Sequence, residues 1–151
     1  VIYFSGESGA NFLRPSDDIG GNNRITDGEL EEWVRKFGGT VTLIIDAHEA
    51  ETFADGPVLE SQAFKKSYYT VLGATRKNQD AGAHEDRYHS WFTYHLLEGI
   101  RTRDADYNRD GDITASELYE YTYGAMQGDS SQTPFFWPGT NGNAVVYRYK
   151  R

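Results

Sequence analysis

The chain has 151 residues, which is enough for one domain with a single hydrophobic core. It carries 23 acidic residues against 15 Lys and Arg, a formal net charge of −8, which argues against nucleic-acid and anionic-membrane partners because both attract clustered positive charge. The absence of cysteine excludes disulfides, thiolate metal ligands and a cysteine nucleophile supplied by this chain.

Strand-like and helix-like segments alternate along the first part of the chain. Residues 1–4 and 41–45 are continuously apolar, which predicts buried parallel strands, and both runs are far too short to span a bilayer. Between them, Thr26-Asp-Gly-Glu29 is a capping-box pattern that predicts the start of an amphipathic helix. Gly38-Gly39 should end that helix, so the three segments form a βαβ unit.

The remaining segments continue the alternation. We expect strands at 68–72 and 144–149, helices at 88–103 and 114–127, and loops at 49–57, 77–85 and 128–142. Three consecutive aromatic residues at 135–137 should fix the last loop to the core. The pattern predicts an α/β fold with a parallel sheet.

The segment from Asp106 to Glu117 matches the EF-hand calcium loop at every specified position. Calcium takes several oxygen ligands, so side chains at alternate positions must converge on one point. Gly111 would allow the sharp turn that this convergence needs, and Thr114 would act through a water. The predicted ligands are Asp106, Asn108, Asp110, the Asp112 carbonyl oxygen and both carboxylate oxygens of Glu117. The alternative is a solvated acidic turn in which Glu117 only caps the next helix.

Two segments at the predicted strand ends resemble the catalytic segments of the caspase and metacaspase superfamily of cysteine peptidases, especially its bacterial caspase-like members. The first family segment reads Tyr-Phe-Ser-Gly-His-Gly, and this chain has Tyr3-Phe-Ser-Gly-Glu7-Ser8. The second reads Leu-Ile-Ile-Asp-Ala-Cys-His-Ser-Gly, and this chain has Leu43-Ile-Ile-Asp-Ala-His48-Glu49-Ala50-Glu51. Further similar stretches make the resemblance extend over essentially the whole chain: 75–81, 91–98, 105–118 and 132–134.

The resemblance implies a caspase-like three-layer sandwich, with a mainly parallel sheet and helices on both faces. Residues 1–151 would then be a single caspase-like domain that lacks its N-terminal strands and helices, because the family fold has further elements before the first catalytic segment. The sequence therefore predicts the C-terminal part of a longer domain.

The departures from the family pattern predict the function. The catalytic His of the family falls on Glu7 and its catalytic Cys falls on His48, so we expect a pseudopeptidase without cysteine-peptidase activity. Asp46 keeps its family identity, which implies a pocket for an Arg or Lys side chain of a peptide or protein partner. A carboxylate in a cleft pairs well with a guanidinium, although an Asp at this position could instead cap a turn.

Three other functions are compatible with the sequence. Ser8, His48 and Glu7 supply the hydroxyl, base and carboxylate of an active serine hydrolase. His48, Glu7 and Glu49 are a ligand set that can hold zinc for metal-dependent hydrolysis. The chain could also be a regulatory or structural module of a larger protein.

Overall fold

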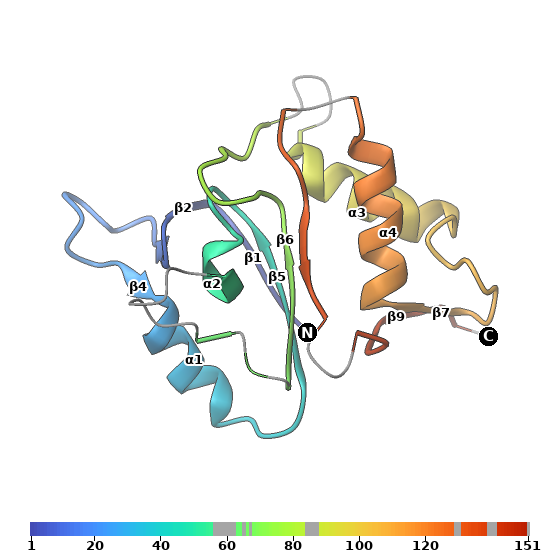
Figure 1. Cartoon of the computed structure of the whole chain (residues 1–151), viewed down its shortest axis with the longest axis horizontal. Helices are drawn as coiled ribbons and strands as arrows, with labels where there is room; N and C mark the ends of the chain where they lie inside the picture. The colour runs from blue at the N-terminus through green and yellow to red at the C-terminus, as the bar shows by residue number, and fades with distance from the viewer. Residues whose placement is uncertain are drawn as a thin grey trace.

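The protein is described by a computed structural model covering residues 1–55, 63–64, 66, 68–83, 88–128, 131–138 and 142–150 (Figure 1). Its first elements are β1 (Ile2–Ser5), β2 (Glu7–Gly9), β3 (Phe12–Arg14), β4 (Ile25–Thr26), α1 (Asp27–Arg35), β5 (Val41–Asp46) and α2 (Thr52–Asp55). These are followed by β6 (Tyr69–Gly73), α3 (Trp91–Thr102), β7 (Asp112–Thr114), α4 (Ala115–Met126), β8 (Phe135–Trp137) and β9 (Val145–Arg148).

The central sheet is mainly parallel, as the apolar runs predict. Its strand order is β1-β5-β6-β8, with β1, β5 and β6 parallel and β8 antiparallel. Strand β1, however, lies at the end of the strand order and none of its residues is buried, so the prediction of a buried strand at residues 1–4 is wrong. Every β5 residue from Thr42 to Asp46 is buried, which explains a run that is apolar without alternation. The register places Ser5 of β1 opposite Asp46 of β5, so these two strands end side by side.

Helices cover both faces of this sheet, so the protein is a mixed α/β fold (Figure 1). Alternate residues of β5 point to opposite faces, and Ile45 and Ile44 accordingly belong to two separate hydrophobic clusters. Helices α1 and α2 pack on the Ile45 side, and α3 and α4 pack on the Ile44 side. Within the described segments, no helix is long and apolar enough to cross a membrane.

The predicted helices are found close to their expected bounds. Thr26 caps α1 and Thr114 caps α4, and both form the complete capping box that the sequence predicts. Helix α3 begins at Trp91 rather than at residue 88, because the Ser90 side chain accepts a hydrogen bond from the Thr93 amide and sets the first turn.

Two predictions about loops are wrong in part. Residues 135–137, placed in a loop, form β8 at the edge of the central sheet, because pairing with β6 stabilises a strand too short to be recognised from its own pattern. Phe135 is buried in the core, which confirms that these aromatic residues anchor the segment. The expected loop at 49–57 contains α2 over its described part.

The strand predicted at 144–149 exists, but it does not join the central sheet. It is β9, which pairs antiparallel with β7 in a separate two-stranded ribbon. A small antiparallel sheet of β2, β3 and β4 was not predicted either. This second sheet follows β1 directly, so it helps to fix Glu7 at the end of the first parallel strand.

Candidate functional site

The first candidate site lies at the adjoining ends of β1 and β5. Parallel strands end at the same edge of a sheet, and here the register brings Glu7 and His48 together. The His48 Nε2 atom lies 3.6 Å from a Glu7 carboxylate oxygen. The two residues that stand at the expected catalytic positions of a caspase-like peptidase are therefore neighbours.

A second carboxylate approaches the other side of the His48 ring. The Nδ1 atom lies 3.1 Å from Asp80 Oδ1, and the Ala81 amide also donates a hydrogen bond to Nδ1 at 3.1 Å. Glu7 and Asp80 are both exposed, whereas His48 is half-buried between them. Asp80 was not predicted, because it lies in a loop without a sequence pattern and only folding brings it to His48.

The serine-hydrolase contacts are not assembled in this arrangement. The Ser8 hydroxyl donates a hydrogen bond to the main-chain carbonyl of His48 at 2.5 Å, so its proton is directed away from the imidazole ring. A base must reach the nucleophile's proton directly or through one water to activate it. Within the described residues, no three or more His, Asp or Glu side chains are gathered into a group that could hold a metal, and this applies both to His48, Glu7 and Glu49 and to the acids of the Asp106–Glu117 loop.

Small residues set the position of the segment that carries His48. Gly73 of β6 lies against Ala50, and a Cβ added at Gly73 would stand 2.8 Å from the Ala50 Cβ. The glycine thus permits close approach of the two backbones. Thr75 completes the attachment, because its hydroxyl donates to the Ala47 carbonyl and accepts from the Ala50 amide.

Asp46 is buried, with 3% of its surface exposed, immediately beside this site. Its Oδ2 atom accepts hydrogen bonds from three hydroxyl groups, those of Ser5, Ser90 and Thr93. These groups come from β1, from the N-cap of α3 and from the first turn of α3. The Oδ1 atom is equally buried but accepts no hydrogen bond from the described residues.

A pocket of about 380 Å³ lies over these hydroxyl groups. Its lining residues are Tyr3, Ser5, Ala83, Tyr88, His89, Ser90 and Thr93. The three residues that bind Asp46 are thus part of the pocket wall, and the carboxylate lies just behind them. Sequence analysis identified Asp46 but missed Ser90 and Thr93, which are distant in the chain and carry no motif.

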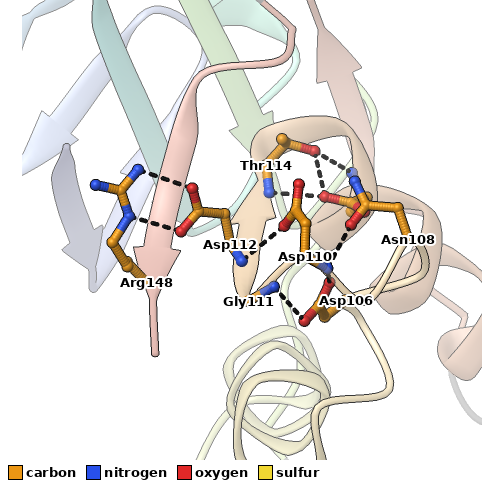
Figure 2. Close-up of polar contacts among 8 residues, drawn as sticks. Asp106, Asn108, Asp110, Gly111, Asp112, Thr114 and Arg148 are labelled. Atoms are coloured by element: carbon orange, nitrogen blue, oxygen red, sulfur yellow. Dashed lines mark hydrogen bonds and ion pairs between the residues drawn. The ribbon is translucent and has the colours of Figure 1, made fainter. Parts of the chain in front are cut away.

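The second candidate site is the predicted calcium loop, which connects α3 to α4 (Figure 2). Asp106 accepts hydrogen bonds from the amides of Asp110 and Gly111, at 3.2 and 3.1 Å. Asn108 accepts from the Asp110 amide at 2.9 Å, and Asp110 accepts from the Asp112 amide at 2.8 Å. The loop's own amides therefore hold three of the predicted ligand side chains toward its interior.

Two backbone positions in this loop have left-handed conformations. Gly111 has φ 90°, which a glycine adopts without steric cost and which gives the sharp turn expected from the motif. Arg109 has φ 60°, a less favourable conformation for a residue with a side chain. The turn that brings Asp106 and Asp110 together is therefore built into the backbone.

The remaining two predicted ligands have other partners in this conformation (Figure 2). Glu117 Oε2 accepts from the amide and the hydroxyl of Thr114, at 3.0 and 2.8 Å, which is the capping role considered as the alternative. The Arg148 guanidinium forms a bidentate ion pair with the Asp112 carboxylate, to which its Nε and Nη2 atoms donate hydrogen bonds at 2.6 and 2.7 Å. The Asp112 pairing is compatible with the motif, because that position supplies a carbonyl oxygen.

Electrostatics near the loop reflect its acids. The pKa of Tyr107 is raised by burial and by the nearby carboxylates of Glu120, Asp104 and Glu117. The pKa of Arg148 is raised by its hydrogen bonds with Asp112 and by the charge of that carboxylate, which stabilise the guanidinium cation. The loop therefore presents negative charge to a cation.

Neither a known protein-family model nor a curated protein matches this chain. The caspase-like resemblance therefore stays a prediction from the sequence.

Proposed function

We propose that this chain is a caspase-like pseudopeptidase domain, which binds calcium through the Asp106–Glu117 loop and holds a basic side chain of a peptide or protein partner at Asp46. The observation that carries the proposal is the meeting of Glu7 and His48 at the adjoining ends of β1 and β5. In an active caspase-like peptidase, a histidine and a cysteine would stand at these two positions.

The pair at this edge does not supply cysteine-peptidase chemistry. That mechanism needs a thiolate and a base that activates it, whereas here a carboxylate faces an imidazole and the chain has no cysteine. Loss of a nucleophile or its base typically lowers the rate of such enzymes by several orders of magnitude. We therefore expect this edge of the sheet to bind a partner without cleaving it.

Asp46 supports binding of a basic side chain. A buried carboxylate is costly unless its oxygens are paired, and three hydroxyl groups pair only Oδ2. A guanidinium or ammonium group in the adjacent pocket would compensate the charge. The pocket volume of about 380 Å³ also lies in the range of about 300–1,000 Å³ that is usual for ligand sites.

Calcium binding is supported by the complete ligand pattern and by the turn that directs Asp106, Asn108 and Asp110 inward. These residues, the Asp112 carbonyl and Glu117 would hold the ion, which would neutralise the clustered acids. In the conformation described, Glu117 caps α4, so metal binding requires its carboxylate to reorient from Thr114 toward the ion.

Calorimetric titration with two peptides tests the binding function. We expect an arginine-containing peptide to bind, and its citrulline counterpart, which has nearly the same shape without the charge, to bind at least about tenfold more weakly. Asp46→Asn should abolish the preference while keeping an acceptor for the hydroxyl groups. Asp17→Asn, which removes the same charge at a remote exposed position, is the matched control. Equal binding of both peptides would refute the basic-side-chain site.

Incubation of the same peptides with the purified protein tests the absence of activity. We expect no cleavage after the arginine. Cleavage that is lost in Ser8→Ala or His48→Ala would overturn the pseudopeptidase proposal and establish the serine hydrolase instead.

A further inference from the structure

The C-terminal strand β9 lies against the second half of the proposed calcium loop. It pairs antiparallel with β7, with Asp112 opposite Arg148 and Ile113 opposite Tyr147. At one end of the ribbon, the Tyr149 amide donates to the Gly111 carbonyl at 3.0 Å. The segment from Gly111 onward is therefore held between the loop ligands on one side and β9 on the other.

Hydrogen bonds just before β9 reach the first turn of α4. The Ala115 amide donates to the Ala144 carbonyl at 2.9 Å, and the Ser116 amide and hydroxyl both donate to the Gly142 carbonyl, at 3.0 and 2.8 Å. Residues 142–149 thus run alongside Gly111–Ser116, with one shift of register between Ile113 and Thr114.

Side chains of the same segment connect the ribbon to the end of α3. The Tyr149 hydroxyl donates to the carbonyl of Ile100, and the Arg103 guanidinium lies 4.4 Å from the centre of the Tyr149 ring. The Arg148–Asp112 ion pair lies across the ribbon itself (Figure 2). Strand β9 and the residues on either side of it therefore contact the loop and both helices that flank it.

The ribbon also belongs to the hydrophobic core. Ile113 of β7 is fully buried in the cluster formed by α3 and α4, and Val146 and Tyr149 pack against the same cluster. An isolated two-stranded ribbon is at best marginally stable, so β9 depends on this packing and on a fixed β7.

We infer that calcium in the loop controls the docking of β9, so that the C-terminal strand is a calcium-dependent clasp. This inference rests on the proposed calcium function. Without the ion, the carboxylates of Asp106, Asp110 and Glu117 repel one another across the loop. With the ion, the Asp112 carbonyl at the start of β7 and Glu117 in the first turn of α4 become ligands, which fixes the strand between them that β9 needs for pairing.

The coupling must be reciprocal. If calcium stabilises docked β9 by a certain factor, docked β9 raises the affinity for calcium by the same factor. The clasp can therefore be tested from the strand and from the loop independently.

Hydrogen exchange of the full chain, measured by mass spectrometry in calcium and in chelator, tests the strand. If bound calcium and docked β9 favour each other by a factor of about five, calcium at a hundred times its Kd should slow exchange of residues 143–149 by about fivefold. Glu117→Gln should show no such slowing. Calcium binding measured by calorimetry without slower exchange of 143–149 would overturn the clasp and leave the calcium function intact. Absence of calcium binding would overturn both.

The affinity for calcium tests the loop. Tyr147→Pro should disrupt pairing of β9, because Tyr147 lies opposite Ile113 at a hydrogen-bonded position of the ribbon and proline cannot donate to a strand ladder. Tyr147→Thr should preserve the pairing. Tyr147 is 41% exposed, and both changes remove the same ring, whose centre lies 5.0 Å from that of Tyr149, so the threonine variant is a matched control. We expect the proline variant to bind calcium about fivefold more weakly than the wild type, and the threonine variant to keep the wild-type affinity. Equal affinity of the two variants would overturn the inference.

Discussion

Helices α1 and α4 begin with two capping boxes of the same geometry, which provide a matched pair for testing the calcium loop. Thr26 pairs with Glu29, and Thr114 pairs with Glu117. In each box the glutamate Oε2 accepts from the threonine amide at 3.0 Å and from its hydroxyl at 2.8 Å, and the glutamate amide donates to that hydroxyl at 3.2 Å. Only Glu117 is also a predicted metal ligand.

Glutamine at either position keeps an oxygen that accepts the capping hydrogen bonds but loses the negative charge. In chelator we therefore expect Glu117→Gln and Glu29→Gln to lower stability by similar, small amounts. In calcium at a hundred times its Kd, a single site stabilises the folded state by about 2.7 kcal/mol, which raises the Tm of a domain of this size by about 5–11 °C. The wild type and Glu29→Gln should show this increase, and Glu117→Gln should show none.

Thermal unfolding followed by circular dichroism, with and without calcium, measures all three proteins. Magnesium at the same concentration controls for general screening of the acids. If Glu117→Gln kept the full increase, Glu117 would have only its capping role. If the wild type showed no increase, the loop would be an acidic turn, and the calcium function would be refuted.

Two further predictions concern packing and pH. Gly99→Ala should lower the free energy of unfolding in urea by about 1–3 kcal/mol, because the added Cβ would stand 2.5 Å from the Tyr121 ring. Gly124→Ala, with no neighbour within 4 Å, should raise it by about 0.5–1 kcal/mol, and equal effects of the two changes would contradict this packing. Burial raises the pKa of Glu31, but hydrogen bonds led by that of Lys66 outweigh it and hold the pKa below its ordinary value of 4.5. Glu31 therefore stabilises the fold above that pH and loses this contribution as the pH falls through its lowered pKa. The stability lost on Glu31→Gln, measured in urea across pH 3–7, should thus shrink on acidification. A loss that stays constant across this range would refute the assignment.

The sequence predicts the elements whose local signals agree with their environment. Strand β5 is recognisable because it is buried on both faces, and α1 and α4 because their capping boxes mark the first turn. Strand β8 has no such signal, since three residues form a strand there only through pairing with β6.

The residues of the candidate sites also differ in whether the sequence alone can predict them. The predicted calcium loop is visible in the sequence because its proposed ligands all lie between Asp106 and Glu117, and Glu7 and His48 are visible because each follows a predicted strand. Asp80 beside His48, and Ser90 and Thr93 on Asp46, could not be predicted, because segments far apart in the chain meet only after folding.

Helix α3 joins the two sites through one continuous element. Ser90 caps its first turn and, with Thr93, holds Asp46, while Ile100 and Arg103 at its other end hold Tyr149 next to the loop. Its 12 residues span about 18 Å at a rise of about 1.5 Å per residue. The helix thus connects the hydroxyl groups that bind Asp46 at its N-terminal end with the residues that contact Tyr149 at its C-terminal end. Under the proposed function, metal coordination in the loop that displaced α3 would move Ser90 and Thr93 relative to Ser5 of β1 and so change the shape of the pocket beside Asp46.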